Sequence, residues 1–146
     1  MRRPRKKAAP KRIQYAALPY RLRSNSRTQV MLVTSRETGR WVIPKGWPQK
    51  RKTPCASAAR EAREEAGVVG RVGKHPIGTY SYKKRLKKGV VVACEVRVFP
   101  LKFKRQQKNW REREEREVHW FSRAKAARVV MEPALRAIIR GLPKRR

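Results

Sequence analysis

Three glutamates, Glu61, Glu64 and Glu65, lie within five residues of each other in a chain that has few acids. The 146 residues contain 41 lysines and arginines against 10 acidic residues, all of them glutamate, for a formal net charge of +31. On a helix, spacings of three and four residues place all three carboxylates on one side, where like charges destabilise the helix by roughly 0.2–0.5 kcal/mol per pair. A local reason for the grouping is therefore required.

Residue types alone leave two interpretations of this cluster open. In the first, arginines neutralise the carboxylates, and Arg60 stands four residues before Glu64, which is the spacing of a helical ion pair. In the second, a hard divalent cation, which prefers carboxylate oxygens, removes the repulsion between them. Such an ion also bridges phosphate groups and activates an attacking water. The flanking residues favour the second interpretation.

The segment from residue 44 to residue 69, PKGWPQKRKTPCASAAREAREEAGVV, resembles the Nudix box, G-x5-E-x7-REUxEExGU, in which U is apolar. The box residues present at the required spacing are Gly46, Arg60, Glu61, Glu64, Glu65 and Gly67. The resemblance implies that Glu61, Glu64 and Glu65 bind Mg²⁺ or Mn²⁺ and act in catalysis together with Arg60. Lys52 stands where the box has a glutamate, which predicts altered metal affinity; a binding-only member of the family is the alternative.

The resemblance covers residues 12–142 and favours one branch of the family. WVIPKGW before the box, YKKR after it and a charged loop leading to VHWFS are similar to the diphosphoinositol polyphosphate and diadenosine polyphosphate phosphohydrolases. This similarity implies hydrolysis of a phosphoanhydride in a polyphosphorylated small molecule by metal-assisted attack of water. It also implies an α+β fold, the Nudix-type α/β/α sandwich with a mixed central β-sheet.

Local signals predict the elements that would position the box. A helix is expected over residues 54–66, with Thr53 as its N-cap, Pro54 in its first turn and Gly67 in the left-handed conformation after its last turn. A second helical region is expected after Ser122, with an interruption near Pro133. Apolar runs of strand length predict strands over residues 13–23, 29–35, 41–44, 70–85, 89–103 and 118–122. We expect a basic, disordered arm over residues 1–12 and one domain over residues 13–146.

A substrate with many phosphates needs many cations, and the sequence offers a set near the box. Arginine suits bidentate phosphate contacts, whereas lysine acts as a point charge. A solvated surface charge explains each of these cations taken singly, so only the set supports the prediction. The residues predicted to bind substrate are Arg21, Arg23, Lys45, Gly46, Lys83, Lys84 and Arg85.

The general base has two candidate sources. One is a glutamate of the box. The other is a cluster of acids late in the chain, within KNWREREERE, where some members of the family place a catalytic glutamate. The cluster consists of Glu112, Glu114, Glu115 and Glu117, of which we predict Glu114 or Glu115.

The charge of +31 leaves other partners open. A strongly positive surface attracts polyanions, so the alternatives to a small-molecule hydrolase are a pyrophosphohydrolase of RNA ends and a non-catalytic RNA-binding protein. The sequence has no apolar run long enough to span a membrane. A cytoplasmic location is expected, although the composition of the first 36 residues, which lack acids, also suits a mitochondrial transit peptide.

Overall fold

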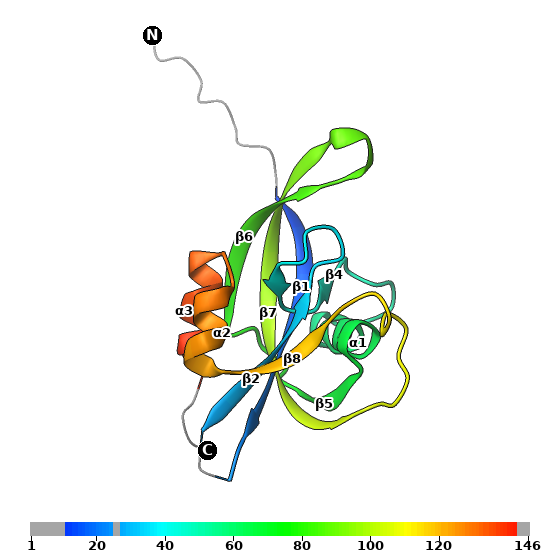
Figure 1. Cartoon of the computed structure of the whole chain (residues 1–146). Coiled ribbons are helices and arrows are strands. Elements are labelled where there is room, and N and C mark those ends of the chain that lie inside the picture. The colour runs from blue at the N-terminus through cyan, green and yellow to red at the C-terminus, as the bar shows by residue number, and fades with distance from the viewer. Residues whose placement is uncertain (1–10, 25–26, 143–146) are drawn as a thin grey trace.

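The computed structural model describes residues 11–24 and 27–142, which form three layers (Figure 1). The elements in chain order are β1 (Arg12–Leu22), β2 (Thr28–Thr34), β3 (Trp41–Val42), β4 (Lys45–Gly46), α1 (Pro54–Ala66), β5 (Val68–Val72), β6 (Gly78–Arg85), the 3-10 turn η1 (Lys87–Gly89), β7 (Val91–Gln106), β8 (Val118–Ser122), α2 (Arg123–Val129) and α3 (Pro133–Arg140). Most of the expected arm lies outside the described residues, and Arg12 already belongs to β1. Within the described ranges no helix is long and apolar enough to span a membrane.

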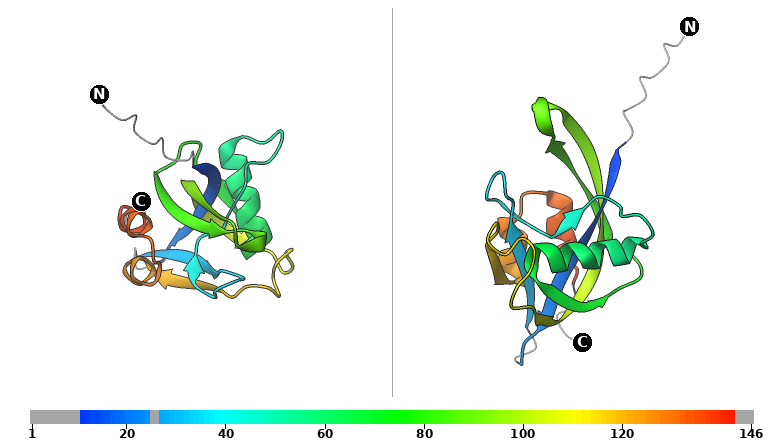
Figure 2. Two further views of the ribbon diagram at one scale, coloured as in Figure 1. Left: turned by 90° about the horizontal axis from the view of Figure 1, so that it is seen from above. Right: turned by 90° about the vertical axis from the view of Figure 1, so that its right-hand side faces the viewer.

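The eight strands form one mixed sheet. Its main path is β3-β2-β1-β7-β5, and β4, β6 and β8 pair with β1, β7 and β2 respectively. β1 runs parallel to β7, with Arg12 opposite Cys94 and Tyr20 opposite Lys102, and α1 lies in the connection between these two strands. Figure 2 shows α1 on one face of the sheet and α2 with α3 on the other. The predicted α+β sandwich with a mixed sheet is confirmed.

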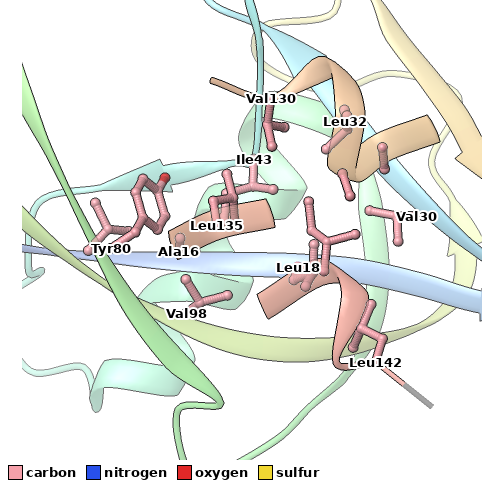
Figure 3. Close-up of a cluster of buried hydrophobic side chains, with 14 residues drawn as sticks. Ala16, Leu18, Val30, Leu32, Ile43, Tyr80, Val98, Val130, Leu135 and Leu142 are labelled. Atoms are coloured by element: carbon pink, nitrogen blue, oxygen red, sulfur yellow. The ribbon is translucent and has the colours of Figure 1, made fainter. Parts of the chain in front are cut away.

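Each face of the sheet carries its own hydrophobic core, because side chains alternate along the strands. Leu18 and Val98 point toward α2 and α3, where they pack with Leu135 and Ile139 (Figure 3). The intervening residues, including Phe99, point toward α1. Full burial of a leucine or phenylalanine side chain contributes roughly 1.5–3 kcal/mol relative to exposure, so the two cores hold both helical layers against the sheet.

The expected helix over residues 54–66 is confirmed as α1, and the helical region after Ser122 is interrupted at Pro133, where α3 begins. The expectation of one strand over residues 70–85 is wrong. β5 ends at Val72 and β6 begins at Gly78, and both pair with β7, at its opposite ends. Pro76, which has no N–H group to donate to a sheet, lies in the connection between them. The 16-residue β7 is long enough to pair with both strands.

Candidate active site

Helix α1 begins and ends at residues that stabilise its termini. The Oγ1 atom of Thr53 accepts a hydrogen bond from the backbone N–H of Ala56 at 3.3 Å, and Pro54 occupies the first turn, where its missing N–H costs nothing. Gly67 follows the last turn with φ 70°, the left-handed conformation that glycine adopts without steric cost. The helix therefore starts and stops at fixed points, which sets the positions of its three glutamates.

Small residues allow the chain to approach α1 closely. The helix packs on the sheet through alanines that are completely buried, Ala58, Ala62 and Ala66. β4 pairs with β1 and places Gly46 directly against Glu61 of the helix. A Cβ atom at residue 46 would lie 2.4 Å from the Glu61 carboxyl group, so any larger residue would displace that carboxyl group.

The loop over residues 107–117 is attached to the C-terminal end of α1. Gln107 donates its backbone N–H to the carbonyl of Gly67 at 2.8 Å, and Glu112 donates its own to the carbonyl of Glu64 at 2.9 Å. The ring of Trp110 lies against Gly67, where a Cβ atom would come within 2.3 Å of it. These contacts bring the acids of the late cluster to the glutamates of α1.

Acids from α1 and from this loop line one cavity of about 500 Å³. Glu61, Glu64 and Glu65 enter it from the helix, and Glu112 and Glu115 enter it from the loop. The cations that share its wall are Arg36, Lys45, Lys84, Arg111 and Arg116. Half of the chain's ten glutamates therefore face one another across a single cavity.

A second cavity of about 520 Å³ continues from the first. The two cavities share six lining residues, among them Lys45, Lys84 and Arg116, so they are two lobes of one cleft. The second lobe is mainly basic: Arg40, Lys83 and Arg85 line it in addition to the shared cations. The cleft thus has an acidic lobe on α1 and a basic lobe between β6 and the loop that follows β2.

The NUDIX domain profile matches residues 16–142, nearly the whole chain. The chain belongs to the Nudix family. Nudix hydrolase 12, mitochondrial, from Arabidopsis thaliana is 29% identical over 126 residues, which is 76% of this chain and 62% of that protein. Diphosphoinositol polyphosphate phosphohydrolase 2 from Rattus norvegicus is 42% identical over 53 residues, 36% of this chain and 30% of its own length. These matches confirm the resemblance to the family and to that branch.

The solved structures confirm the Nudix fold. The crystal structure of a C. elegans Ap4A hydrolase superposes with a TM-score of 0.60 over 90% of this chain and 95% of that one, at 15% sequence identity. The NUDIX domain of Shewanella oneidensis NrtR, in complex with ADP ribose, has a TM-score of 0.65 over 90% and 86% of the two chains, also at 15% identity. The chain spans less than two thirds of the length of the plant relatives, whose names include the word mitochondrial. The expected cytoplasmic location therefore stays a prediction.

The Nudix box contains a positioning residue that the sequence pattern did not reveal. Gln49 lies in the loop between β4 and α1, at a position that the box leaves unspecified. Its Nε2 atom donates to Glu61 Oε1 at 3.1 Å, and its Oε1 atom accepts from Arg60 Nη1 at 2.9 Å. Arg60 Nε in turn donates to Glu64 Oε1 at 2.9 Å. Lys52, which replaces the box glutamate, is exposed and lines neither lobe.

The carboxyl groups of Glu61 and Glu65 are crowded and poorly solvated. Burial raises the pKa of Glu65 to about 8, against the opposing effect of Arg116, whose Nη2 atom lies 3.8 Å from Glu65 Oε2. Burial and then the charge of Glu64 raise the pKa of Glu61, which is also hydrogen-bonded to Glu65. Burial lowers the pKa of Lys45, which faces Glu65. Burial and the neighbouring carboxylates thus disfavour the ionised forms of Glu61 and Glu65.

The donor set suits a divalent cation, and members of the Nudix family use such ions. Crowded carboxylates with raised pKa values are groups whose ionised form a hard divalent cation stabilises. Among residues 11–24 and 27–142, no three acidic, histidine or cysteine side chains are already grouped closely enough to hold an ion. Glu64 is turned toward Arg60 and Arg111 instead. The chemistry of the site fits a metal, and Glu64 would exchange these arginine partners for the ion.

The cations predicted from the sequence divide into two groups. Lys45, Gly46, Lys83, Lys84 and Arg85 all line the cleft. The structure does not bring Arg21 and Arg23 there. The guanidinium of Arg21 lies 3.9 Å from the centroid of the Trp120 ring and donates to Gln29 Oε1 at 2.9 Å. β1 meets the cleft near Tyr15 and Ala16, where β4 pairs with it, and Arg21 lies five residues further along the strand.

The late acids are also separated by the structure. Glu115 lines the acidic lobe and pairs with Arg36 Nη1 at 2.9 Å, whereas Glu114 lines neither lobe. Glu112 belongs to the same cluster but was not predicted as the base. It lines the acidic lobe and accepts a hydrogen bond from Arg116 Nε at 2.8 Å. Nothing in the local sequence distinguishes these acids, because the loop has no regular period that would assign each one a direction.

Proposed function

We propose that this Nudix protein is a metal-dependent pyrophosphohydrolase that cleaves a phosphoanhydride in a highly phosphorylated small molecule, of the diadenosine polyphosphate or diphosphoinositol polyphosphate type. The observation that carries the proposal is the continuity of the two lobes. One lobe gathers five carboxylates, and the adjoining lobe gathers cations from four segments of the chain. An anionic chain longer than a single diphosphate would contact both lobes.

In this proposal Glu61, Glu64 and Glu65 hold Mg²⁺ or Mn²⁺. The bound ion would neutralise phosphate charge and lower the pKa of the attacking water. Arg60 and Gln49 orient the carboxylates of Glu64 and Glu61. Lys45, Lys84 and the rest of the basic lobe bind the phosphates that are not hydrolysed. Glu115 is the base that we prefer from the late cluster, because it lines the acidic lobe and Glu114 does not; a glutamate of the box is the other candidate.

A substrate panel tests the proposed activity. Release of phosphate or nucleotide is measured with Mg²⁺ and with Mn²⁺ for dinucleoside polyphosphates, inositol pyrophosphates, nucleoside triphosphates and triphosphorylated RNA. We expect turnover of the first two classes, loss of turnover in EDTA, and a higher kcat/KM for substrates with four or more phosphates than for dinucleoside diphosphates. Turnover confined to triphosphorylated RNA would show that the protein is a pyrophosphohydrolase of RNA ends instead. No turnover of any compound would contradict an enzymatic role.

The basic lobe should control KM for long phosphate chains. Replacing Lys83, Lys84 and Arg85 together with serine removes three cations from the lobe, and we expect KM to rise about tenfold or more for a diadenosine polyphosphate. For a diadenosine diphosphate, which reaches fewer cations, the rise should be less than about threefold. The matched control replaces Lys87 and Lys88, exposed residues of the same hairpin that line neither lobe. Equal KM changes for both substrates would remove the lobe from phosphate recognition.

Gln49 should control how readily the metal binds. In Gln49→Leu neither Glu61 nor Arg60 is oriented, so the Mg²⁺ concentration for half-maximal activity should rise by about 10-fold or more, the usual effect of losing a partner of a metal ligand. KM for the substrate at saturating Mg²⁺ should change little. Lys50→Ala, at the next residue and exposed, is the control. Unchanged Mg²⁺ dependence in Gln49→Leu would make its hydrogen bonds incidental to the site.

A further inference from the structure

A third cavity, of about 450 Å³, lies between α3 and the sheet. It is an apolar groove, and Tyr20, Ile77, Pro100 and Ile138 form its walls. Ile77 keeps 43% of its surface exposed beside it. The groove shares no lining residue with either lobe of the candidate active site, so it is a separate feature of the surface.

A row of cations continues from this groove across the open face of the sheet. Tyr20 in β1 stands opposite Lys102 in β7, and Lys102 stands opposite Arg71 in β5. Leu101 and Phe103 pack on the α1 side, so Lys102 and Lys104 point to the same face as Tyr20. Arg71, Lys102 and Lys104 are all exposed.

This arrangement is unfavourable without a partner. Like charges directly opposite on adjacent strands, such as Arg71 and Lys102, destabilise the pair. None of the ten glutamates lies in β1, β5, α3 or the part of β7 from residue 100 onward. Within the described residues, no ion pair involves Arg71, Lys102 or Lys104. The face therefore combines an aromatic and apolar recess with a row of cations that no acid neutralises.

We propose that this face binds single-stranded nucleic acid, with bases in the groove against Tyr20 and the backbone phosphates on Arg71, Lys102 and Lys104. Single strands are bound where aromatic side chains stack on bases beside a basic track for the phosphates. A peptide of acidic residues alone would pair with the cations but leave the apolar groove empty. A lipid bilayer would meet the cations but could not enter a recess between a helix and a sheet.

The proposal is independent of the proposed hydrolysis, because binding is measured in EDTA on the full chain. Fluorescence anisotropy with labelled 12-nucleotide RNA and DNA of mixed sequence gives the affinity at several salt concentrations. Replacing Arg71, Lys102 and Lys104 together with serine should weaken binding at least about tenfold and reduce the salt slope by about two, the value for three lost contacts to a single strand. Tyr20→Leu should weaken binding about fivefold or more with little change in slope.

The matched control removes the same number of exposed cations elsewhere, in Lys50→Ser/Lys87→Ser/Lys88→Ser, and should change affinity less than about twofold. The RNA and DNA arms show which of the two strands is preferred. Three results would overturn the proposal. They are equal losses of affinity in the control and in the Arg71/Lys102/Lys104 variant, an unaltered affinity in Tyr20→Leu, and a poly-glutamate peptide that competes for binding as well as an unlabelled oligonucleotide does. Thermal denaturation of the Tyr20 variant and of the triple variant, measured in parallel with the wild-type protein, shows that they remain folded.

Discussion

Glu64→Gln and Glu65→Gln should each lower kcat by at least about a hundredfold while the protein remains folded. Both residues lie in the acidic lobe, and each amide keeps the size of the side chain while removing the charge that holds a cation. Raising the Mg²⁺ concentration should restore part of the activity if the loss is one of metal affinity. The measurement is steady-state hydrolysis of the best substrate in the panel over a range of Mg²⁺ concentrations.

A control for these variants is Glu95→Gln. Glu95 lies on β7, pairs with Arg97 and lines neither lobe of the cleft, so its loss removes one acid without touching the site. We expect its kcat to stay within about twofold of the wild-type value, as for a surface substitution away from the site. Near-full activity in Glu64→Gln at low Mg²⁺ would show that the metal lies elsewhere.

The second large effect concerns stability in the absence of metal. Burial raises the pKa of Glu65 from 4.5 to about 8, so between these values the folded state binds a proton that the unfolded state does not. Stability therefore falls as pH rises through this window. In EDTA the Tm of the wild-type protein should decrease from pH 5 to pH 8.5, because the buried carboxyl group must ionise. Divalent cations should reverse part of the decrease, since they bind the ionised form.

Glu65→Gln removes this ionisation. At pH 8.5 in EDTA we expect its Tm to exceed that of the wild-type protein by about 5 °C or more, and at pH 5 we expect the two to be close. The variant should thus be more stable and less active than the wild type. Thermal denaturation at several pH values measures the effect, with Glu95→Gln as the control for the loss of an acid. A Glu65→Gln protein that is less stable than the wild type at pH 8.5 would contradict the claim that burial of the ionised Glu65 carboxylate destabilises the folded state in EDTA.

The sequence predicted those parts of the site that depend on neighbours along the chain. Helix α1, its caps at Thr53 and Gly67, and the common face of Glu61, Glu64 and Glu65 all follow from spacing within 15 residues, because helix geometry is local. The break at Pro133 follows in the same way. These features needed no knowledge of how the strands pair.

The parts that were not predicted depend on pairing between distant segments. Arg21 lies in β1, where the sequence predicts a strand. Its distance from the cleft, however, follows from the pairing of β4 with Tyr15 and Ala16. The split of residues 70–85 into two strands follows from both strands sharing β7. Gln49 and Glu112 reach the site through loops, whose direction is set by single hydrogen bonds to α1 rather than by any period in the sequence.

Hydrolysis in ¹⁸O-labelled water tests the central claim most directly. The protein is incubated with a diadenosine polyphosphate or an inositol pyrophosphate in H₂¹⁸O, once with Mg²⁺ and once with EDTA. The masses of the products are then measured by mass spectrometry. The proposed mechanism predicts one ¹⁸O atom in a single phosphate-containing product, formed with Mg²⁺ and not with EDTA. Cleavage at the same rate in EDTA, or no cleavage of either substrate with Mg²⁺, would contradict a metal-dependent phosphoanhydride hydrolase built on Glu61, Glu64 and Glu65.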